Sequence, residues 1–83
     1  MANSTHIRKI VDFMARAFQR DDVPVDEDIF ASGFATSLFA MQLVDFVERE
    51  FGITVEAEDL ELDNFRSVAA VAALVERKTA RAA

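Results

Sequence analysis

The chain has 83 residues, a formal net charge of −6 and no cysteine, which excludes a disulfide framework, a thiolate metal site and a cysteine nucleophile. Half of the residues are hydrophobic, with only two glycines and one proline, so we expect a single helical domain over 1–83 with an ordered core over 4–78. No stretch approaches the roughly 20 apolar residues of a transmembrane helix, and the N-terminus lacks the apolar run of a signal peptide.

The acidic residues are concentrated in the middle of the chain. Residues 21–63 contain 13 of the 15 acids and only one of the nine bases, Arg49, so this segment has a charge of −12. Such a field repels nucleic acid and anionic lipid and attracts basic protein surfaces. We therefore expect protein partners, no nucleic acid and no membrane, and the lack of cysteine fits the cytoplasm.

Apolar residues at steps of three and four predict a first helix from about Ser4 to Phe18. It should end near Gln19, before the proline that follows at position 24, because a residue preceding proline disfavours helix. Residues 21–36 then form a long loop, which needs apolar anchors to lie across the other helices. The expected anchors are Val25, Ile29, Phe30 and Phe34.

A second helix should begin at Thr36 or Ser37 and reach Phe51, with Gly52 as the left-handed residue that ends it. Residues 53–55 then form an extended link. The buried stripe of this helix is expected to be Ala40, Leu43, Val44, Val47 and Phe51.

A short acidic helical turn is predicted near 57–62, with Leu60 and Leu62 pointing inward and Phe65 as a plug after it. Ser67 should cap the final helix. The inner face of that helix is expected to be Val68, Val71, Ala72 and Val75. The fold class is therefore all-α: a small antiparallel four-helix bundle of three main helices and one short one, with a long first loop.

The chain has little material for catalysis. Its only histidine, His6, lies at the start of the first predicted helix, where we expect a surface residue. Residues 26–28 are acidic but lack the ligand spacing and central glycine of a calcium loop, so we interpret them as solvated. The sequence predicts no catalytic residues, no metal site and no enzyme activity.

Ser37 lies where the long loop enters the second helix. Unpaired N–H groups and the positive end of the helix dipole favour an attached phosphate there. With Thr36 as the N-cap, Ser37 would be the first helical residue and point outward. The simpler alternative, that Ser37 is itself a capping serine, stays open on the residues alone.

Leu38 and Met41 lie three residues apart and off the predicted buried stripe, and Asp45 and Glu48 continue their face. An apolar pair that runs into acids is typical of a docking surface for basic partners. The alternative is that Leu38 merely covers the loop.

The segment from Gly33 to Gly52 resembles the modification helix of acyl, aminoacyl and peptidyl carrier proteins. The resemblance rests on the Ser37-Leu38 pair, the Phe51-Gly52-Ile53 ending and the Ser67-Val68 start of the last helix, and it covers most of 7–78. It implies a four-helix bundle in which Ser37 receives 4′-phosphopantetheine from a phosphopantetheinyl transferase. The intermediate then rides as a thioester, and Leu38, Met41, Asp45 and Glu48 would recognise partners.

Two positions depart from the family pattern. Thr36 stands where the family typically has aspartate, and Phe39 stands where an acid is common. Threonine can still cap a helix, but the missing charge bears on which transferases recognise the chain.

The run from Ser37 to Val44, with Asp59 to Phe65 further on, is similar to stand-alone carriers of polyketide and antibiotic pathways. Those carriers take up a glyceryl unit that is oxidised toward hydroxymalonyl or methoxymalonyl extenders. An aminoacyl or peptidyl carrier is one alternative, and an unmodified helical interaction module is an alternative of another class. We expect a monomer that acyl-loading and acyl-modifying enzymes visit.

Overall fold

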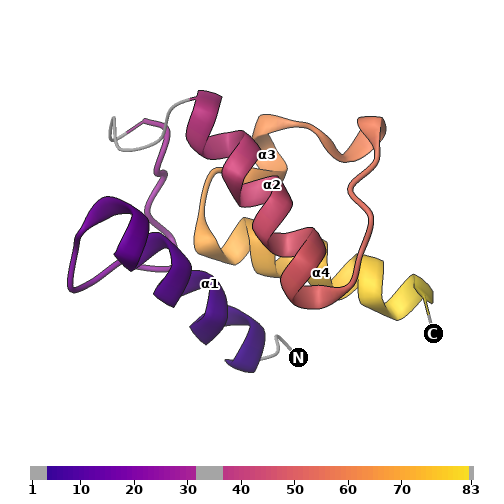
Figure 1. The fold of residues 1–83 in the computed structure, drawn as a ribbon, viewed down its shortest axis with the longest axis horizontal. Helices are drawn as coiled ribbons and strands as arrows, with labels where there is room; N and C mark the ends of the chain where they lie inside the picture. The colour runs from indigo at the N-terminus through magenta and orange to yellow at the C-terminus, as the bar shows by residue number, and fades with distance from the viewer. Residues whose placement is uncertain (1–3, 32–36, 83) are drawn as a thin grey trace.

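The computed structural model describes residues 4–31 and 37–82, which form helices and no strand (Figure 1). The elements are α1 (Ser4–Phe18), α2 (Ser37–Phe51), the 3₁₀ helix η1 (Ala57–Asp59), α3 (Leu62–Phe65) and α4 (Val68–Ala82). This confirms the predicted all-α bundle. None of the helices in the described ranges is long and apolar enough to cross a membrane.

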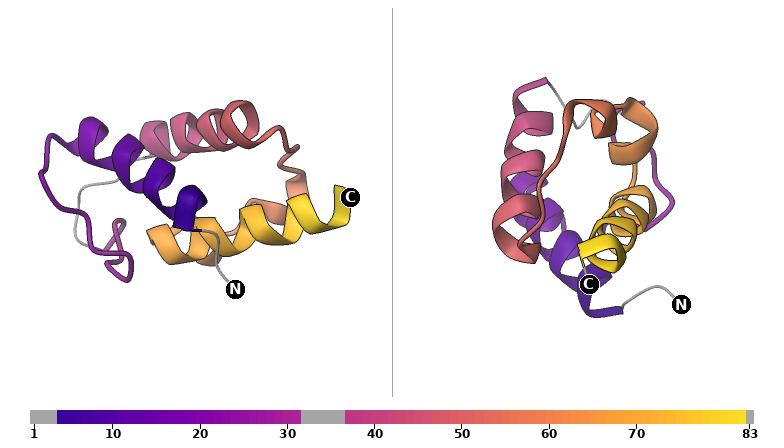
Figure 2. Two further views of the ribbon diagram at one scale, coloured as in Figure 1. Left: turned by 90° about the horizontal axis from the view of Figure 1, so that it is seen from below. Right: turned by 90° about the vertical axis from the view of Figure 1, so that its right-hand side faces the viewer.

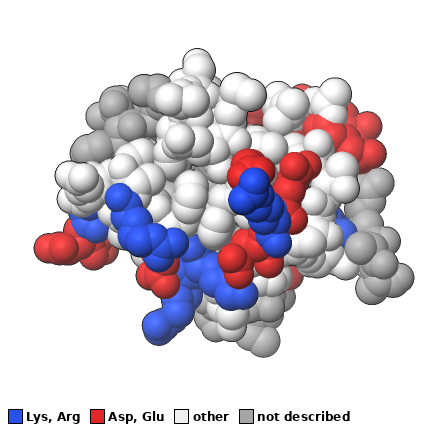
Figure 3. Space-filling model, viewed as in Figure 1, with Lys and Arg blue, Asp and Glu red and all other residues white. Residues whose placement is uncertain are grey.

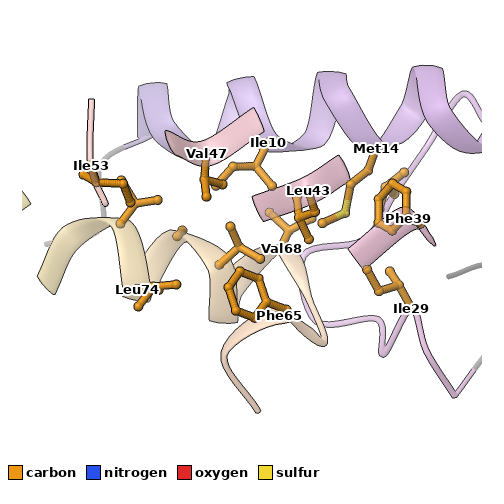
Figure 4. Packing of buried hydrophobic residues seen from close by; sticks show 14 residues of the cluster. Ile10, Met14, Ile29, Phe39, Leu43, Val47, Ile53, Phe65, Val68 and Leu74 are labelled. Carbon is orange, nitrogen blue, oxygen red and sulfur yellow. The ribbon is translucent and has the colours of Figure 1, made fainter. Parts of the chain in front are cut away.

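Helix α4 is the element against which the others pack. It contacts α1, α2 and α3, and Figure 2 shows α1 and α2 on one side of it, with α3 close to its N-terminal end. Figure 4 shows the core between these helices, with Leu43 and Val47 of α2 facing Ile10 of α1 and Val68 of α4. All four of these side chains are fully buried.

The predicted inner face of α4 is buried, but the predicted stripe of α2 is confirmed only in part. Leu43 and Val47 are buried, whereas Ala40, Val44 and Phe51 are only half-buried. Phe39, to which the sequence assigned no role, is buried. Leu74 of α4, absent from the predicted inner face, is also fully buried. The reason for Phe39 is aromatic packing against α1: its ring lies 5.8 Å from that of Phe13 and 4.7 Å from that of Phe18.

The first loop is held against the α3–α4 junction by backbone hydrogen bonds. The amide of Ile29 donates to the carbonyl of Arg66 at 2.8 Å, and the amide of Ala69 donates to the carbonyl of Val25 at 2.9 Å. Ile29 is buried as predicted, but Val25 is 38% exposed and Val23 is buried in its place. The hydrogen bond from Ala69 explains why Val23 and not Val25 is buried, because it turns the carbonyl of Val25 toward the bundle. Phe34 lies outside the described residues.

The connection from α2 to α4 corrects one prediction. Leu60 and Leu62, expected to point inward, are 57% and 52% exposed. Phe65 is buried as predicted and is the residue of α3 that enters the core. Ser67 caps α4 as predicted, its Oγ accepting a hydrogen bond from the amide of Ala70 at 3.1 Å.

Both long connections leave a helix through a left-handed residue. Gln19 has φ 56° after α1, and Gly52 has φ 66° after α2. A Cβ added at Gly52 would meet nothing within 4 Å, so only backbone conformation opposes a side chain there.

Gly52→Ala is therefore expected to lower the free energy of unfolding by about 1 kcal/mol, the cost of a left-handed L-residue. Urea denaturation measures the change. Gly52→Asn is the matched control and should cost less, because asparagine tolerates this conformation. Equal losses for both variants would contradict the backbone explanation.

Candidate functional site

Ser37 is the first residue of α2, and its side chain is exposed. The first turn of α2 contains no acidic residue. Its free N–H groups and positive dipole end are therefore not neutralised by a neighbouring carboxylate in that turn, which suits a covalently attached phosphate. The predicted N-cap, Thr36, lies outside the described residues.

Ser37 lies at the edge of an open groove of about 610 Å³. The groove is formed by the first loop, α2, α3 and the two residues that precede α3. Its only charged lining residue among those described is Glu61. The apolar lining residues are Phe30, Ala40, Met41, Val44, Leu60, Leu62 and Phe65.

Phe30 forms the wall contributed by the first loop, and Asp28 holds it in place. The Oδ1 atom of Asp28 accepts hydrogen bonds from the amides of Phe30 at 3.1 Å and Ala31 at 3.0 Å. Asp28 also lies 3.7 Å from the Nε atom of Arg66. Asp28 thus stabilises the backbone of the loop at Phe30.

A second loop acid, Glu27, is also engaged. Glu27 pairs with Arg20 at 2.7 Å, and this hydrogen bond raises the pKa of the Arg20 guanidinium. Within the described ranges no three His, Cys, Asp or Glu side chains are grouped to hold a metal ion. The prediction that residues 26–28 are solvated therefore holds for the exposed Asp26, whereas Glu27 and Asp28 are half-buried ion-pair and turn residues.

The four residues predicted to form a partner face are placed differently from one another. Leu38 and Met41 are 67% and 73% exposed, and Asp45 is exposed and pairs with Arg49 at 3.2 Å. Glu48 is half-buried, and its Oε2 atom accepts a hydrogen bond from the amide of Val55 at 2.8 Å. Figure 3 shows a largely uncharged area over the N-terminal half of α2.

His6 packs more closely than a surface residue. It is half-buried, and its ring meets that of Phe51 edge-on with centroids 4.8 Å apart. Its position at the start of α1 is as predicted, but the aromatic contact with the end of α2 gives it a packing role.

Of the residues that line the groove, the sequence pointed only to Ser37 and Met41 as site residues. Leu60 and Leu62 were assigned to the core, Phe30 was treated only as a loop anchor, and Glu61 was given no role. Ala40, Val44 and Phe65 were likewise expected in the core. The alternation of Leu60, Glu61 and Leu62 predicts that the two leucines share a side, but it does not say whether that side faces the core.

The arrangement provides an exposed hydroxyl at the first residue of a helix whose first turn holds no acidic residue, next to an apolar groove. Comparison of the chain with curated proteins gives no match. A family model described as the phosphopantetheine attachment site matches residues 8–75, which is most of the chain. The chain therefore belongs to the phosphopantetheine attachment site family: it is a carrier that holds covalently bound 4′-phosphopantetheine and is not itself a catalyst.

Proposed function

We propose that Ser37 is the attachment point of the phosphopantetheine and that the chain presents a small acyl unit to biosynthetic enzymes. The observation that carries this proposal is the position of Ser37: it is exposed at the first residue of a helix of 15 residues and borders the groove. When bound, the group supplies a terminal thiol that holds the acyl unit as a thioester.

The residues around Ser37 suit each part of that group. The N–H groups of the first turn of α2 are placed to stabilise the phosphate charge. Met41 and Leu62 offer apolar surface to the methyl and methylene groups of the arm. Glu61 places a negative charge on the groove, which disfavours a cargo that carries a free carboxylate within it.

Carrier domains of this family interact with a phosphopantetheinyl transferase and with biosynthetic enzymes. For this chain we place that contact on Leu38, Met41, Asp45 and Glu48, extended by Leu60 and Leu62. The two exposed leucines enlarge the apolar surface beside Ser37. The hydrogen bond between Glu48 and Val55 gives Glu48 a supporting role in that surface. Asp45 is exposed, and a basic partner would compete with Arg49 for its carboxylate.

The cargo we propose is a glyceryl-derived unit on its way to a hydroxymalonyl or methoxymalonyl extender in polyketide or related antibiotic biosynthesis. The segments 37–44 and 59–65 resemble stand-alone carriers of such pathways, and this resemblance supports the choice. A polar unit loses hydrogen bonds with water if it enters an apolar groove. It would therefore stay in solvent, within reach of the oxidising and methylating enzymes, and a cytoplasmic location fits this use of a cysteine-free chain.

Intact-mass spectrometry of the protein purified from its native host, followed by tandem spectrometry of the released arm, tests the cargo. We expect a glyceryl unit or its oxidised product. An amino acid on the arm would identify an aminoacyl carrier, and a long acyl chain would also overturn the glyceryl proposal. The protein purified without any attached group, from a host that modifies its other carriers, would favour an unmodified interaction module.

Loading should depend on ionic strength. Because residues 21–63 carry a charge of −12, a basic loading enzyme is steered toward the chain at low salt. We expect the second-order loading rate to fall several-fold between about 0.1 M and about 1 M salt, as the screening length shrinks. Stopped-flow or quenched loading assays measure it, and circular dichroism at both salt concentrations is the control for folding. A constant rate would contradict acidic steering.

A further inference from the structure

Leu60 and Leu62 form one wall of the groove, and the segment that carries them makes little hydrophobic contact with the core. Ile53 and Phe65 are buried, but none of the eleven residues between them is. Val55 is half-buried against the core, but a segment of this length with so little other apolar burial has little to fix its position. Something else must hold it against the bundle.

Polar contacts with α4 supply that attachment. The Nζ atom of Lys78 lies 2.7 Å from Oδ2 of Asp59 and 3.1 Å from Oε1 of Glu56. The side chains of Lys78 and Asp59 are only 11% and 13% exposed. An ion pair this shielded from water is stronger than the exposed pairs elsewhere on the chain.

The contact at Asp59 is transmitted to the groove through the backbone. Oδ2 of Asp59 also accepts a hydrogen bond from the amide of Glu56 at 3.0 Å. The same carboxylate therefore stabilises the turn over 56–59 and binds Lys78. The amide of Leu60 donates to the carbonyl of Ala57, and the amide of Glu61 donates to the carbonyl of Asp59. The position of Asp59 therefore sets the positions of Leu60 and Glu61, which line the groove.

We propose that Lys78 is a positioning residue, whose ion pairs with Asp59 and Glu56 hold the Leu60–Leu62 wall of the groove beside Ser37. Arg77, which donates to Oδ1 of Asn64 at 3.1 Å, adds a second, exposed contact between α4 and the same segment. Lys78 does not line the groove itself; it acts through its contacts with Glu56 and Asp59. The hydrogen bond that Lys78 donates to Asp59 raises the pKa of Lys78 against the opposing effect of burial, which agrees with a retained charge at this place.

Lys78→Met tests the proposal in the unmodified protein, since methionine keeps much of the apolar stem and removes the charge. Hydrogen exchange of the amides of Glu56, Asp59, Leu60 and Glu61 is expected to become roughly fivefold to tenfold faster, with core amides such as those of Leu43 and Val75 unchanged. Lys78→Arg should restore most of the protection. The matched control is Lys9→Met, which removes a lysine paired with Glu50 at 2.9 Å and should leave these amides unaffected.

A second measurement reports on the groove itself. The chain has no cysteine, so Val44→Cys introduces a unique thiol into the groove, and Val11→Cys introduces one on α1 outside it. Combined with Lys78→Met, labelling by a maleimide should become several-fold faster at position 44 and stay constant at position 11. Glu56→Gln, which removes only the more exposed partner, should give a smaller change of the same sign and serves if Lys78→Met does not fold.

Unchanged exchange in Lys78→Met would overturn the proposal, and so would faster exchange of the whole chain, which would indicate a merely structural residue. Faster exchange without faster labelling at position 44 would also overturn it, because the wall would then not depend on the ion pairs. None of these readouts requires a modified Ser37, so failure here is distinguishable from failure of the attachment site.

Discussion

Ser37→Ala is expected to abolish attachment of phosphopantetheine completely. The variant removes the hydroxyl that would form the phosphodiester, and an exposed alanine at the first helical position is compatible with the fold. Because the side chain makes no part of the core, the free energy of unfolding should change by no more than about 0.5 kcal/mol. Intact mass after incubation with coenzyme A and a broad-specificity transferase measures the modification.

Thr54→Ala is the matched control, because Thr54 is also exposed but lies on the link after α2, away from the helix N-terminus. It should be modified as completely as the unaltered protein. Modification of Ser37→Ala would show that another residue is the attachment point, and peptide mapping would test the neighbouring hydroxyl of Thr36 first. A folded, unaltered chain that several transferases leave unmodified would contradict attachment at Ser37.

Leu43→Ala is expected to produce the largest loss of stability. Leu43 is fully buried between α1, α2 and α4, and truncation of such a leucine costs about 2–5 kcal/mol. A domain of this size has a total stability toward the lower part of about 5–15 kcal/mol. The variant should therefore be largely or partly unfolded at 37 °C, and urea denaturation followed by circular dichroism measures the change.

Met41→Ala, two residues earlier on the same helix, provides the contrast. Met41 is 73% exposed, so its truncation should change the free energy of unfolding by no more than about 0.5 kcal/mol. We expect it instead to slow loading by partner enzymes, since it borders Ser37 and the groove. Equal destabilisation by the two variants would mean that the two faces of α2 are not separated as described.

The helices could be predicted from the sequence because each carries its own signals. The spacing of Ile10, Met14 and Phe18 and the left-handed glycine at position 52 depend only on neighbours along the chain. The bounds of α1 and α2 agree with the predicted ranges. Ser67 was likewise identifiable as a cap, because capping is a contact over three residues.

The errors occurred where burial depends on contacts between distant segments. Leu60 and Leu62 have the apolar character of core residues, but the fold buries Phe65 and leaves the two leucines exposed at the groove. Val23 is buried in place of Val25 because the carbonyl of Val25 accepts a hydrogen bond from the amide of Ala69 on α4. Phe39 is buried because two aromatic rings of α1 lie opposite it.

The sequence by itself determined the helical class and the limits of α1 and α2, and it led to the proposal of Ser37, because periodicity, caps and a resemblance along the chain are local properties. Only the tertiary structure decided which apolar residues border Ser37 and what holds them there. Phe30, Met41 and Leu62 belong to three different segments, and Lys78 meets Asp59 across 19 positions of the chain. Such proximity follows from how the helices pack, and no local pattern encodes it.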